Sequence, residues 1–417
     1  MAAKREKAMM SGLSKLGIAA LACLVGSASA HAQSDGKIRI GVQIAQTGNA
    51  STLGVPGLKG IRFAAETINK RGGLDVGGKK YQIEIVARDD GSSPETARAV
   101  VQQLITEEKV DFLIAGVYSN IVASVMPIAE RYGVPTISTF AYSPKVIPAN
   151  AKYSFVNVMS ISDQFQGPLE FLKENGVNTV ALAASNDDLG EGFVRTMPRY
   201  LEQYGLKLAG VERFETNTTN FAPIMARLKA TKADALIVEA GDPLSYQFRV
   251  AQKQYQACKT FKFTVYEYGP PLQPDWVNST KGAGIGGVGQ SFWWKTQKGF
   301  EDRWFGNNAG FMKAYKEGTG EDAVWSTAQG VQSMTLMALA IEKAGKVDRD
   351  AVAKAFLELD GSTLFGPIKF DPVDHFNRGF VKNQLVIQQQ GPTLADAKII
   401  HPASQAEAKW IPDSCGE

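Results

Sequence analysis

Histidine is scarce in this sequence, which has three histidines among 417 residues. None of His31, His375 and His401 lies in a G-x-S-x-G or H-E-x-x-H pattern, so these signals of a serine nucleophile and of a zinc protease are missing. Adjacent carboxylates occur at 89–90 and 187–188, but acidic pairs of this kind are typical of solvated turns and helix caps. We therefore expect a protein that is not an enzyme and that holds no metal.

A strong excess of charge of either sign is also missing. The whole chain has 45 basic and 42 acidic residues, and its first 32 residues contain four basic residues and one acidic residue. Without that segment the chain has 41 of each and a formal net charge of zero. A nucleic-acid-binding protein typically shows a basic excess or stripe, so we expect no nucleic-acid partner.

Phosphate-binding loops are absent or out of context. The sequence has no Gly-Lys-Ser or Gly-Lys-Thr loop, which excludes a P-loop ATPase. Residues 284–289 satisfy G-x-G-x-x-G, but they neither follow a clear strand nor open a helix, and a dinucleotide-binding loop needs that setting. We therefore expect no cofactor.

After its N-terminal segment the sequence has no long apolar run. Within that segment, residues 16–25 form an apolar stretch that is short for a bilayer span. A basic start precedes this stretch, and Ala28-Ser29-Ala30 follows it. This pattern is typical of a secretory signal peptide, so we expect residues 1–32 to be a cleaved leader and the protein to be periplasmic. Cys23 leaves lipidation as an alternative, although the residues before it make a poor lipidation box.

Two cysteines, Cys258 and Cys415, remain after the expected leader. Their spacing fits no metal-binding pattern. In an oxidising compartment two cysteines can pair, but sequence spacing does not show whether they are close in space. A disulfide between them stays open at this point.

From residue 37 onward, short apolar runs alternate with longer amphipathic runs. Expected strands are 38–44, 81–86, 110–114, 135–138, 153–158, 179–184, 206–214, 235–238 and 263–266. Expected helices between them are 58–70, 95–108, 119–132, 164–175, 191–204, 221–230 and 245–256. This alternation predicts an α/β fold with parallel sheets covered by helices on both faces, divided into two lobes near 148–150 and 269–271. The remainder is too irregular for a separate domain, so we expect it to complete both lobes and to form a hinge that suits closure around a ligand.

Several stretches in order resemble the leucine/isoleucine/valine-binding-protein family, which are type I periplasmic binding proteins. They are residues 38–97, 110–144, 185–193 (SNDDLGEGF), 217–238 and 366–372 (GPIKFDP), and they span nearly the whole chain after the leader. The resemblance implies two flavodoxin-like, doubly wound lobes joined by a three-crossover hinge. It places 34–148 and 271–378 in the N-terminal lobe, and 151–268 and 379–417 in the C-terminal lobe.

The resemblance also implies a solute-binding protein of an ABC importer, which takes up an amino acid or a related small carboxylate and delivers it to a permease in the inner membrane. Such a carrier is expected to be a monomer. The alternative is an extracytoplasmic ligand-sensing subunit of a signalling system. The ligand itself is open, because branched-chain amino acids, aromatic acids and amides all fall within the family's range.

Two loops of the expected N-terminal lobe are candidates for ligand contact. Tyr118, Ser119 and Asn120 stand between a strand and a helix, where helix-start N–H groups bind anions, and Ser119 matches the family's carboxylate-binding position. The alternative is that Ser119 only caps its helix. Phe140, Ala141 and Tyr142 match the second contact loop. Two aromatic residues there indicate stacking on a flat or bulky ligand, with lobe packing as the alternative.

The remaining candidates depart from the family pattern or match it loosely. The family has aromatic residues at or near the positions of Leu53, Leu189 and Gly241. Their absence here argues against a branched-chain amino acid as the ligand. Asp242 could contact the ligand or cap a helix. Glu267 is the candidate partner of a ligand ammonium group, although the local match is shifted by about two residues.

The adjacent indoles at 293–294 leave two interpretations open. They could line the mouth of a cleft, or they could pack in a core, which is the commoner place for large aromatic side chains.

Overall fold

The structure, a computed structural model, describes residues 36–241, 243–267 and 275–413, and in these ranges six strands form a first sheet in the order β2–β3–β1–β4–β5–β6. The strands are β1 (Lys37–Ile44), β2 (Leu74–Val76), β3 (Lys79–Asp89), β4 (Phe112–Ala115), β5 (Thr136–Ser138) and β6 (Ser154–Val156). All pairs are parallel except β2–β3. The parallel part has the 2-1-3-4-5 order of a flavodoxin-like sheet.

The second sheet repeats this order. Among the described residues it has seven strands in the order β15–β14–β11–β10–β9–β7–β8. The strands are β7 (Thr179–Ser185), β8 (Lys207–Phe214), β9 (Ala235–Glu239), β10 (Phe263–Tyr266), β11 (Val288–Ser291), β14 (Leu385–Gln389) and β15 (Ala397–His401). β14 and β15 join antiparallel at one edge. The predicted fold of two doubly wound lobes is therefore confirmed.

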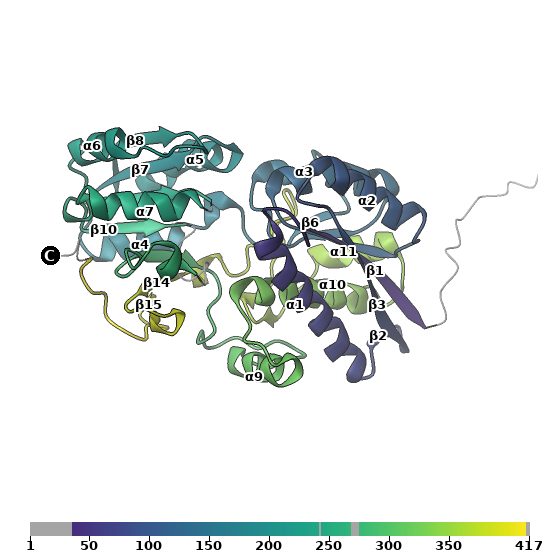
Figure 1. The fold of residues 1–417 in the computed structure, drawn as a ribbon. Coiled ribbons are helices and arrows are strands. Elements are labelled where there is room, and N and C mark those ends of the chain that lie inside the picture. The colour runs from purple at the N-terminus through teal and green to yellow at the C-terminus, as the bar shows by residue number, and fades with distance from the viewer. Residues whose placement is uncertain (1–35, 242, 268–274, 414–417) are drawn as a thin grey trace, which may run out of the picture. The chain divides into compact units, whose positions relative to one another are not determined.

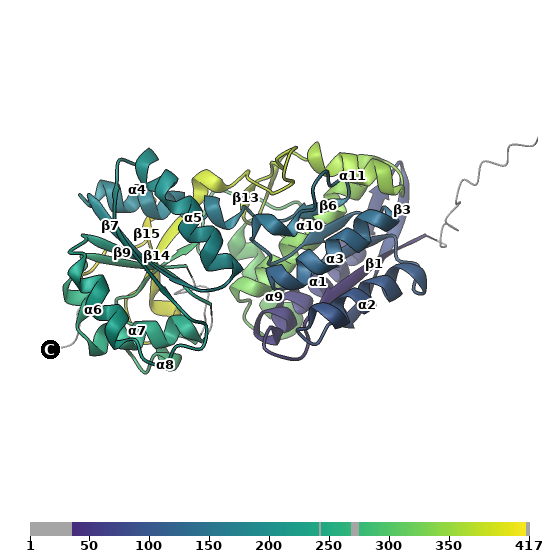
Figure 2. The same cartoon turned by 90° about the horizontal axis from the view of Figure 1, so that it is seen from above.

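Helices cover both faces of each sheet, which is why the central strands are buried almost completely. In the first lobe α1 (Ser51–Lys70) packs on α10 (Trp325–Ala344), and α2 (Pro94–Thr106) packs on α3 (Ser119–Tyr132) on the opposite face (Figure 1). Figure 2 shows the strands of the second sheet between α4 and α5 on one side and α6 and α7 on the other. The other helices are α4 (Gln166–Glu174), α5 (Asp188–Gln203), α6 (Ala222–Ala230), α7 (Leu244–Gln254), α8 (Trp276–Ser279), α9 (Asn308–Thr319) and α11 (Arg349–Leu357).

Glycine allows α1 and α10 to approach closely. A Cβ atom added at Gly330 would lie 2.0 Å from the carbonyl oxygen of Gly57, and one at Gly60 would lie 2.0 Å from the carbonyl oxygen of Thr327. A carbon atom cannot lie this close to a carbonyl oxygen, so the backbones of the two helices are in direct contact at these positions.

Within the described residues the chain passes between the two sheets three times, after β6, after β11 and before β14. A small hairpin of β12 (Ser362–Thr363) and β13 (Gly366–Pro367) precedes the last passage. Arg378 at the third passage donates to Asp163 at the first with an Nε–Oδ2 distance of 3.0 Å. It also pairs with Asp371 and Asp374, so one guanidinium ties two crossing segments together.

Strand membership differs from the expected lobe boundaries in two places. β6 pairs with β5 in the first sheet, because the segment 148–150 is only a turn between two neighbouring strands. β11 pairs with β10 in the second sheet, although we expected 271–378 in the first lobe. The glycine-rich run before β11 hid this short strand from the sequence pattern.

Residues 1–32, the expected leader, lie outside the described residues. Between residues 36 and 413, the described helices include none with both the length and the apolar character of a membrane span. Cys258 is disulfide-bonded, while Cys415 lies outside the described residues.

Candidate ligand-binding site

The predicted contact loops lie at the carboxyl ends of parallel strands, where α/β sheets bind ligands. In the first lobe 118–120 follow β4 and 140–142 follow β5. In the second lobe the predicted Glu267 follows β10; two carboxylates that were not predicted as contacts also lie at strand ends, Asp187 after β7 and Glu239 at the end of β9. Contacts within and between these loops define the site.

Ser119 joins two of the loops. It is the first residue of α3, whose N-cap is Tyr118, so the alternative that Ser119 caps the helix is wrong. Its Oγ instead accepts hydrogen bonds from the backbone N–H groups of Tyr142 and Ser143, each at 3.2 Å. A hydroxyl also has one proton to donate, so Ser119 keeps a donor for another partner.

The neighbours of Ser119 are partly open to solvent. Tyr118 is 36% exposed, and its hydroxyl donates to the carbonyl oxygen of Asn49 at 3.4 Å. Asn120 is exposed, and Leu53 is half-buried against the core of the first lobe. Contact of these three side chains with a ligand stays a prediction.

An aromatic cluster surrounds the loop after β5. Phe140 lies 5.7 Å from Trp325 between ring centroids, Trp325 lies 5.8 Å from Phe292, and Phe292 lies 6.1 Å from Tyr142. All four rings are at most 4% exposed, and Ala141 beside them is fully buried. The Tyr142 hydroxyl and the Trp325 indole N–H find no hydrogen-bond partner among the described residues. The cluster therefore combines apolar ring faces with two unused donors.

Sequence reasoning missed Phe292 and Trp325. Phe292 stands directly before the indoles at 293–294, which pack in cores instead. The indole N–H of Trp293 donates to Asn308 Oδ1 at 2.6 Å, and Trp294 packs in a cluster of the second lobe. The core interpretation of both tryptophans is therefore the correct one. Trp325 carried no signal in the sequence, because the first residue of a buried helix is an ordinary position for an aromatic side chain.

Two buried glutamates mark the second lobe's part of the site. Glu239 is fully buried and Glu267 is 1% exposed. Both oxygens of Glu239 and Oε2 of Glu267 have no hydrogen-bond donor among the described residues. Burial raises the pKa of both carboxyl groups, and their mutual proximity and the charge of Asp187 add to the effect on Glu267.

Burial also raises the pKa of Tyr142, with a contribution from Glu267, so this side chain of the first lobe lies within the field of a carboxyl group of the second. Glu239 was missed by sequence reasoning. The available signal was a charged residue at the end of an otherwise apolar central strand.

The other predicted residues of the second lobe are Leu189, Gly241 and Asp242. Asp187 caps α5, since it accepts from the N–H groups of Leu189 at 3.1 Å and Gly190 at 2.9 Å. Leu189 is half-buried in the first turn of that helix. A Cβ atom at Gly241 would meet nothing within 4 Å, so the backbone there borders open space. Asp242 lies outside the described residues.

An ion pair connects the two lobes beside the site. Lys145, in the 3-10 helix η1 (Pro144–Val146), lies 2.8 Å from Asp188 at the start of α5. Both side chains are more than half exposed, at 53% and 58%. Because both charges are exposed to solvent, dissolved salt weakens the attraction between them.

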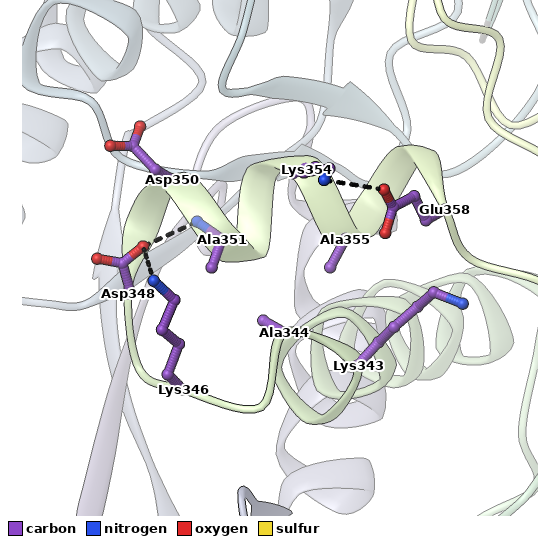
Figure 3. A pocket seen from close by; sticks show the side chains of 9 residues that line it. All are labelled: Lys343, Ala344, Lys346, Asp348, Asp350, Ala351, Lys354, Ala355 and Glu358. Atoms are coloured by element: carbon purple, nitrogen blue, oxygen red, sulfur yellow. Dashed lines mark hydrogen bonds and ion pairs between the residues drawn. The ribbon is translucent and has the colours of Figure 1, made fainter.

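A pocket elsewhere in the first lobe contains none of the predicted residues. It lies at the turn between α10 and α11 and is lined mainly by charged side chains (Figure 3). These charges pair locally, for example Lys354 with Glu358 and Lys346 with Asp348, both at 3.5 Å. The pocket has no unpaired buried group that points to a ligand.

The first lobe thus contributes hydrogen-bond donors and the second lobe contributes acceptors, and Tyr142 lies within the field of Glu267. The first lobe contributes the hydroxyl groups of Ser119 and Tyr142 and the indole of Trp325. The second lobe contributes the carboxyl groups of Glu239 and Glu267. A small molecule with an acidic end and a basic end would complement both sets.

The chain matches the family of periplasmic binding proteins over residues 37–381. It is 24% identical over 379 residues to the leucine-, isoleucine-, valine-, threonine- and alanine-binding protein of Pseudomonas aeruginosa, which covers 90% of this chain and 95% of that relative.

Two solved structures have a similar fold. One is the branched-chain amino acid transporter substrate binding protein of Streptococcus pneumoniae in complex with isoleucine, with a TM-score of 0.71, 22% identity, and coverage of 88% of this chain and 100% of that chain. The other is a solute binding protein of an ABC transporter from Rhodopseudomonas palustris in complex with p-hydroxybenzoic acid, with a TM-score of 0.72, 20% identity, and coverage of 90% and 96%.

Proposed function

This chain belongs to the periplasmic binding protein family, and on that premise we propose that it is the solute-binding protein of an ABC importer. In this proposal residues 1–32 direct it to the periplasm, where it acts as a monomer. It captures an amino acid or a related small carboxylate and delivers it to a permease of the inner membrane. It catalyses no reaction and needs no cofactor.

The observation that carries this proposal is the set of unpaired buried polar groups at the carboxyl ends of both sheets. Tyr142, Trp325, Glu239 and Glu267 each bury at least one polar atom without a partner among the described residues. An unpaired buried polar group costs about 1–3 kcal/mol, and Tyr142, Glu239 and Glu267 bury theirs at or next to the ends of parallel strands, where such sheets bind ligands. A ligand that bonds to them removes that cost.

The proposed mechanism is a hinged clamp. The first lobe binds the ligand through Ser119 and the loop 140–142, and the second lobe closes with Leu189, Gly241 and Glu267. Three crossings of the chain make the hinge, and Lys145–Asp188 forms when the lobes meet. A ligand that binds the closed form more tightly shifts the population toward it, and a permease can recognise that form.

Two ligand classes are in competition. The Pseudomonas relative and the Streptococcus complex are named for amino acids, whereas the Rhodopseudomonas complex holds an aromatic acid. Phe140 and Tyr142 suit a flat ligand of either class. The two classes differ in whether the ligand has an amine.

A thermal-shift screen tests the proposed function. The protein is refolded without ligand and melted with L-leucine, L-phenylalanine, benzoate, 4-hydroxybenzoate and short amides. A ligand at 100 times its Kd adds about 2.7 kcal/mol to the free energy of unfolding, which raises Tm by about 3 °C for a chain of this size.

Two variants make the screen specific. Tyr142→Ala should lose the shift, because it removes a ring of the site. Lys354→Ala, in the charged pocket of α11, should keep it. If no compound shifts Tm, or if Tyr142→Ala leaves the shift intact, the proposed function or the proposed site is wrong.

A further inference from the structure

The last described residues of the chain are fixed along the second lobe. Gln388 on β14 donates to the carbonyl oxygen of Ile411 at 2.7 Å and accepts from the N–H group of Ile411 at 3.0 Å. Gln390 donates to the carbonyl oxygen of Lys409 at 2.8 Å. These bonds determine where Asp413, the last of the described residues, meets the lobe.

Asp413 completes a buried ion cluster on α7. Arg249 is fully buried, and its two Nη atoms lie 2.6 Å and 2.9 Å from the carboxylate oxygens of Asp413. Lys253 Nζ lies 2.7 Å from the same carboxylate. Arg249 also donates to the carbonyl oxygens of Ala283 at 2.8 Å and Ile285 at 3.0 Å. Because a buried guanidinium is costly without a carboxylate, the second lobe needs the C-terminal segment in place.

The glycine-rich run 284–289 allows this close approach. Gly286 has a φ of +87°, which favours glycine, and a Cβ atom added to it would lie 2.6 Å from Oδ1 of Asp413. The G-x-G-x-x-G pattern, which lacks the setting of a phosphate loop, therefore provides room for the C-terminal segment beside the loop before β11.

Cys258 adjoins the same cluster. It lies in the 3-10 helix η3 (Ala257–Lys259), directly after α7, and its Sγ is 4.0 Å from the carbonyl oxygen of Gln252. The side chain of Gln252 accepts from Arg249 Nη1 at 2.9 Å. Cys258 is disulfide-bonded, so a second cysteine must reach this end of α7.

The chain has two other cysteines, Cys23 in the expected leader and Cys415, which stands two residues after Asp413. Two residues span at most about 7 Å, and a disulfide joins Cα atoms about 4–7 Å apart. We propose that Cys415 is the partner of Cys258 and that their disulfide fixes the C-terminal segment to the end of α7. This proposal takes from the proposed function only the removal of residues 1–32 and the oxidising compartment.

The bond forms by thiol–disulfide exchange with a disulfide oxidant. The thiolate of one cysteine attacks a sulfur of the oxidant and releases the first oxidant thiol, and the second thiolate attacks the protein sulfur of this mixed disulfide and releases the other. The two cysteines lose two protons and two electrons, and the oxidant's disulfide becomes two thiols. Cytosolic thiols stay reduced, so the bond forms after export.

The disulfide closes a long loop, from residue 258 to residue 415. Closing a long loop restricts the unfolded chain, which stabilises the folded state. The thiol form should therefore melt about 3–5 °C lower than the disulfide form.

Peptide mapping tests the pairing. The full chain is expressed in a bacterium with a periplasm, its free thiols are blocked with iodoacetamide, and it is digested with trypsin without reduction. Cleavage after lysine gives peptides 254–259 and 410–417, which hold one cysteine each. We expect these two peptides to be linked and to separate on reduction. Protein that is reduced and then treated with oxidised glutathione should regain the link.

Thermal melting tests the effect of the bond. The reductant TCEP should lower the Tm of the wild type by about 3–5 °C. Cys415→Ser should have the lower Tm from the start, and TCEP should not change it. Cys415→Ser is more informative than Cys258→Ser, because Cys258 is buried and its replacement also changes packing. Ser414→Ala keeps both cysteines and should respond to TCEP as the wild type does.

The outcomes distinguish the inference from the proposed function. Free thiols at both cysteines after glutathione treatment, a link of Cys258 to Cys23, a link between two copies on a non-reducing gel, or an unchanged wild-type Tm in TCEP each overturns the inference. If the first peptide of the map begins before residue 33, the leader is retained and the proposed export fails, while glutathione treatment still decides the pairing. If the oxidised protein binds none of the screened compounds, the solute-binding function fails and the linked peptides still stand.

Discussion

Substitution of Gly330 by alanine tests how close α1 and α10 must be. The added Cβ atom would lie 2.0 Å from the carbonyl oxygen of Gly57. Carbon–oxygen contacts are normally no shorter than about 3.3 Å, so one helix must move by roughly 1.3 Å. A gap of about 1 Å removes up to half of the attraction at each atomic contact along the interface.

The expected cost follows from two opposing effects. Overpacking of a tight core costs up to about 3 kcal/mol. Alanine in a helix is favoured over glycine by about 1 kcal/mol. We therefore expect Gly330→Ala to lower the free energy of unfolding by about 2 kcal/mol.

Urea unfolding measures this change, read as a lower midpoint at an unchanged slope. Gly192→Ala in α5 is the matched control, because the nearest atom to its added Cβ is Ile161 Cγ2 at 3.9 Å. The control should be as stable as the wild type or more stable by up to about 1 kcal/mol. If Gly330→Ala is no less stable than the wild type, the close helix contact is not a constraint and the reasoning fails.

Three further predictions concern buried polar groups. Tyr142→Phe removes an unpaired hydroxyl, so it should stabilise the ligand-free protein by about 1 kcal/mol in urea unfolding and weaken ligand binding; a loss of stability would contradict this. The raised pKa of Glu239 and Glu267 means that the folded ligand-free protein holds a proton that the unfolded chain loses above about pH 4.3. Stability should therefore fall as pH rises from about 5 to about 8, by up to about 1.4 kcal/mol per pH unit for one proton, and less steeply in Glu239→Gln; a rising wild-type stability would refute this. Asp413→Asn should cost about 3 kcal/mol in urea unfolding, because it leaves the fully buried Arg249 without its carboxylate partner, and a loss below about 1 kcal/mol would contradict this.

Local patterns predicted much of the fold. The helix expected at 119–132 has these bounds in the structure, because its apolar spacing and its terminal Gly133 are local features. Parallel strands are buried on both faces, so their apolar runs were also visible in the sequence. β6 was expected in the second lobe, and the segment that contains β11 was expected in the first, because strand partners are chosen by pairing across the sheet, which no local pattern encodes.

The candidate site was predictable to the same extent. The ends of parallel strands indicated the loops 118–120 and 140–142 and Glu267, all of which lie where ligands bind in such folds. The partners of these residues were not predictable. Trp325 contacts Phe140, and Phe292 contacts Tyr142. In the sequence the strands of the second lobe separate these partners, so no local pattern links them.

The contact between α1 and α10 also determines when the first lobe can finish folding during synthesis. The face of α1 that holds Gly57 and Gly60 packs on α10, and α10 arrives only with residues 325–344, after the parallel strands of the second sheet. A nascent chain that grows from its N-terminus therefore cannot finish its first lobe before most of the second lobe exists. Contacts between segments this far apart in sequence are typical of slow folding. The two lobes should consequently become protease-resistant together and late in synthesis, rather than one after the other.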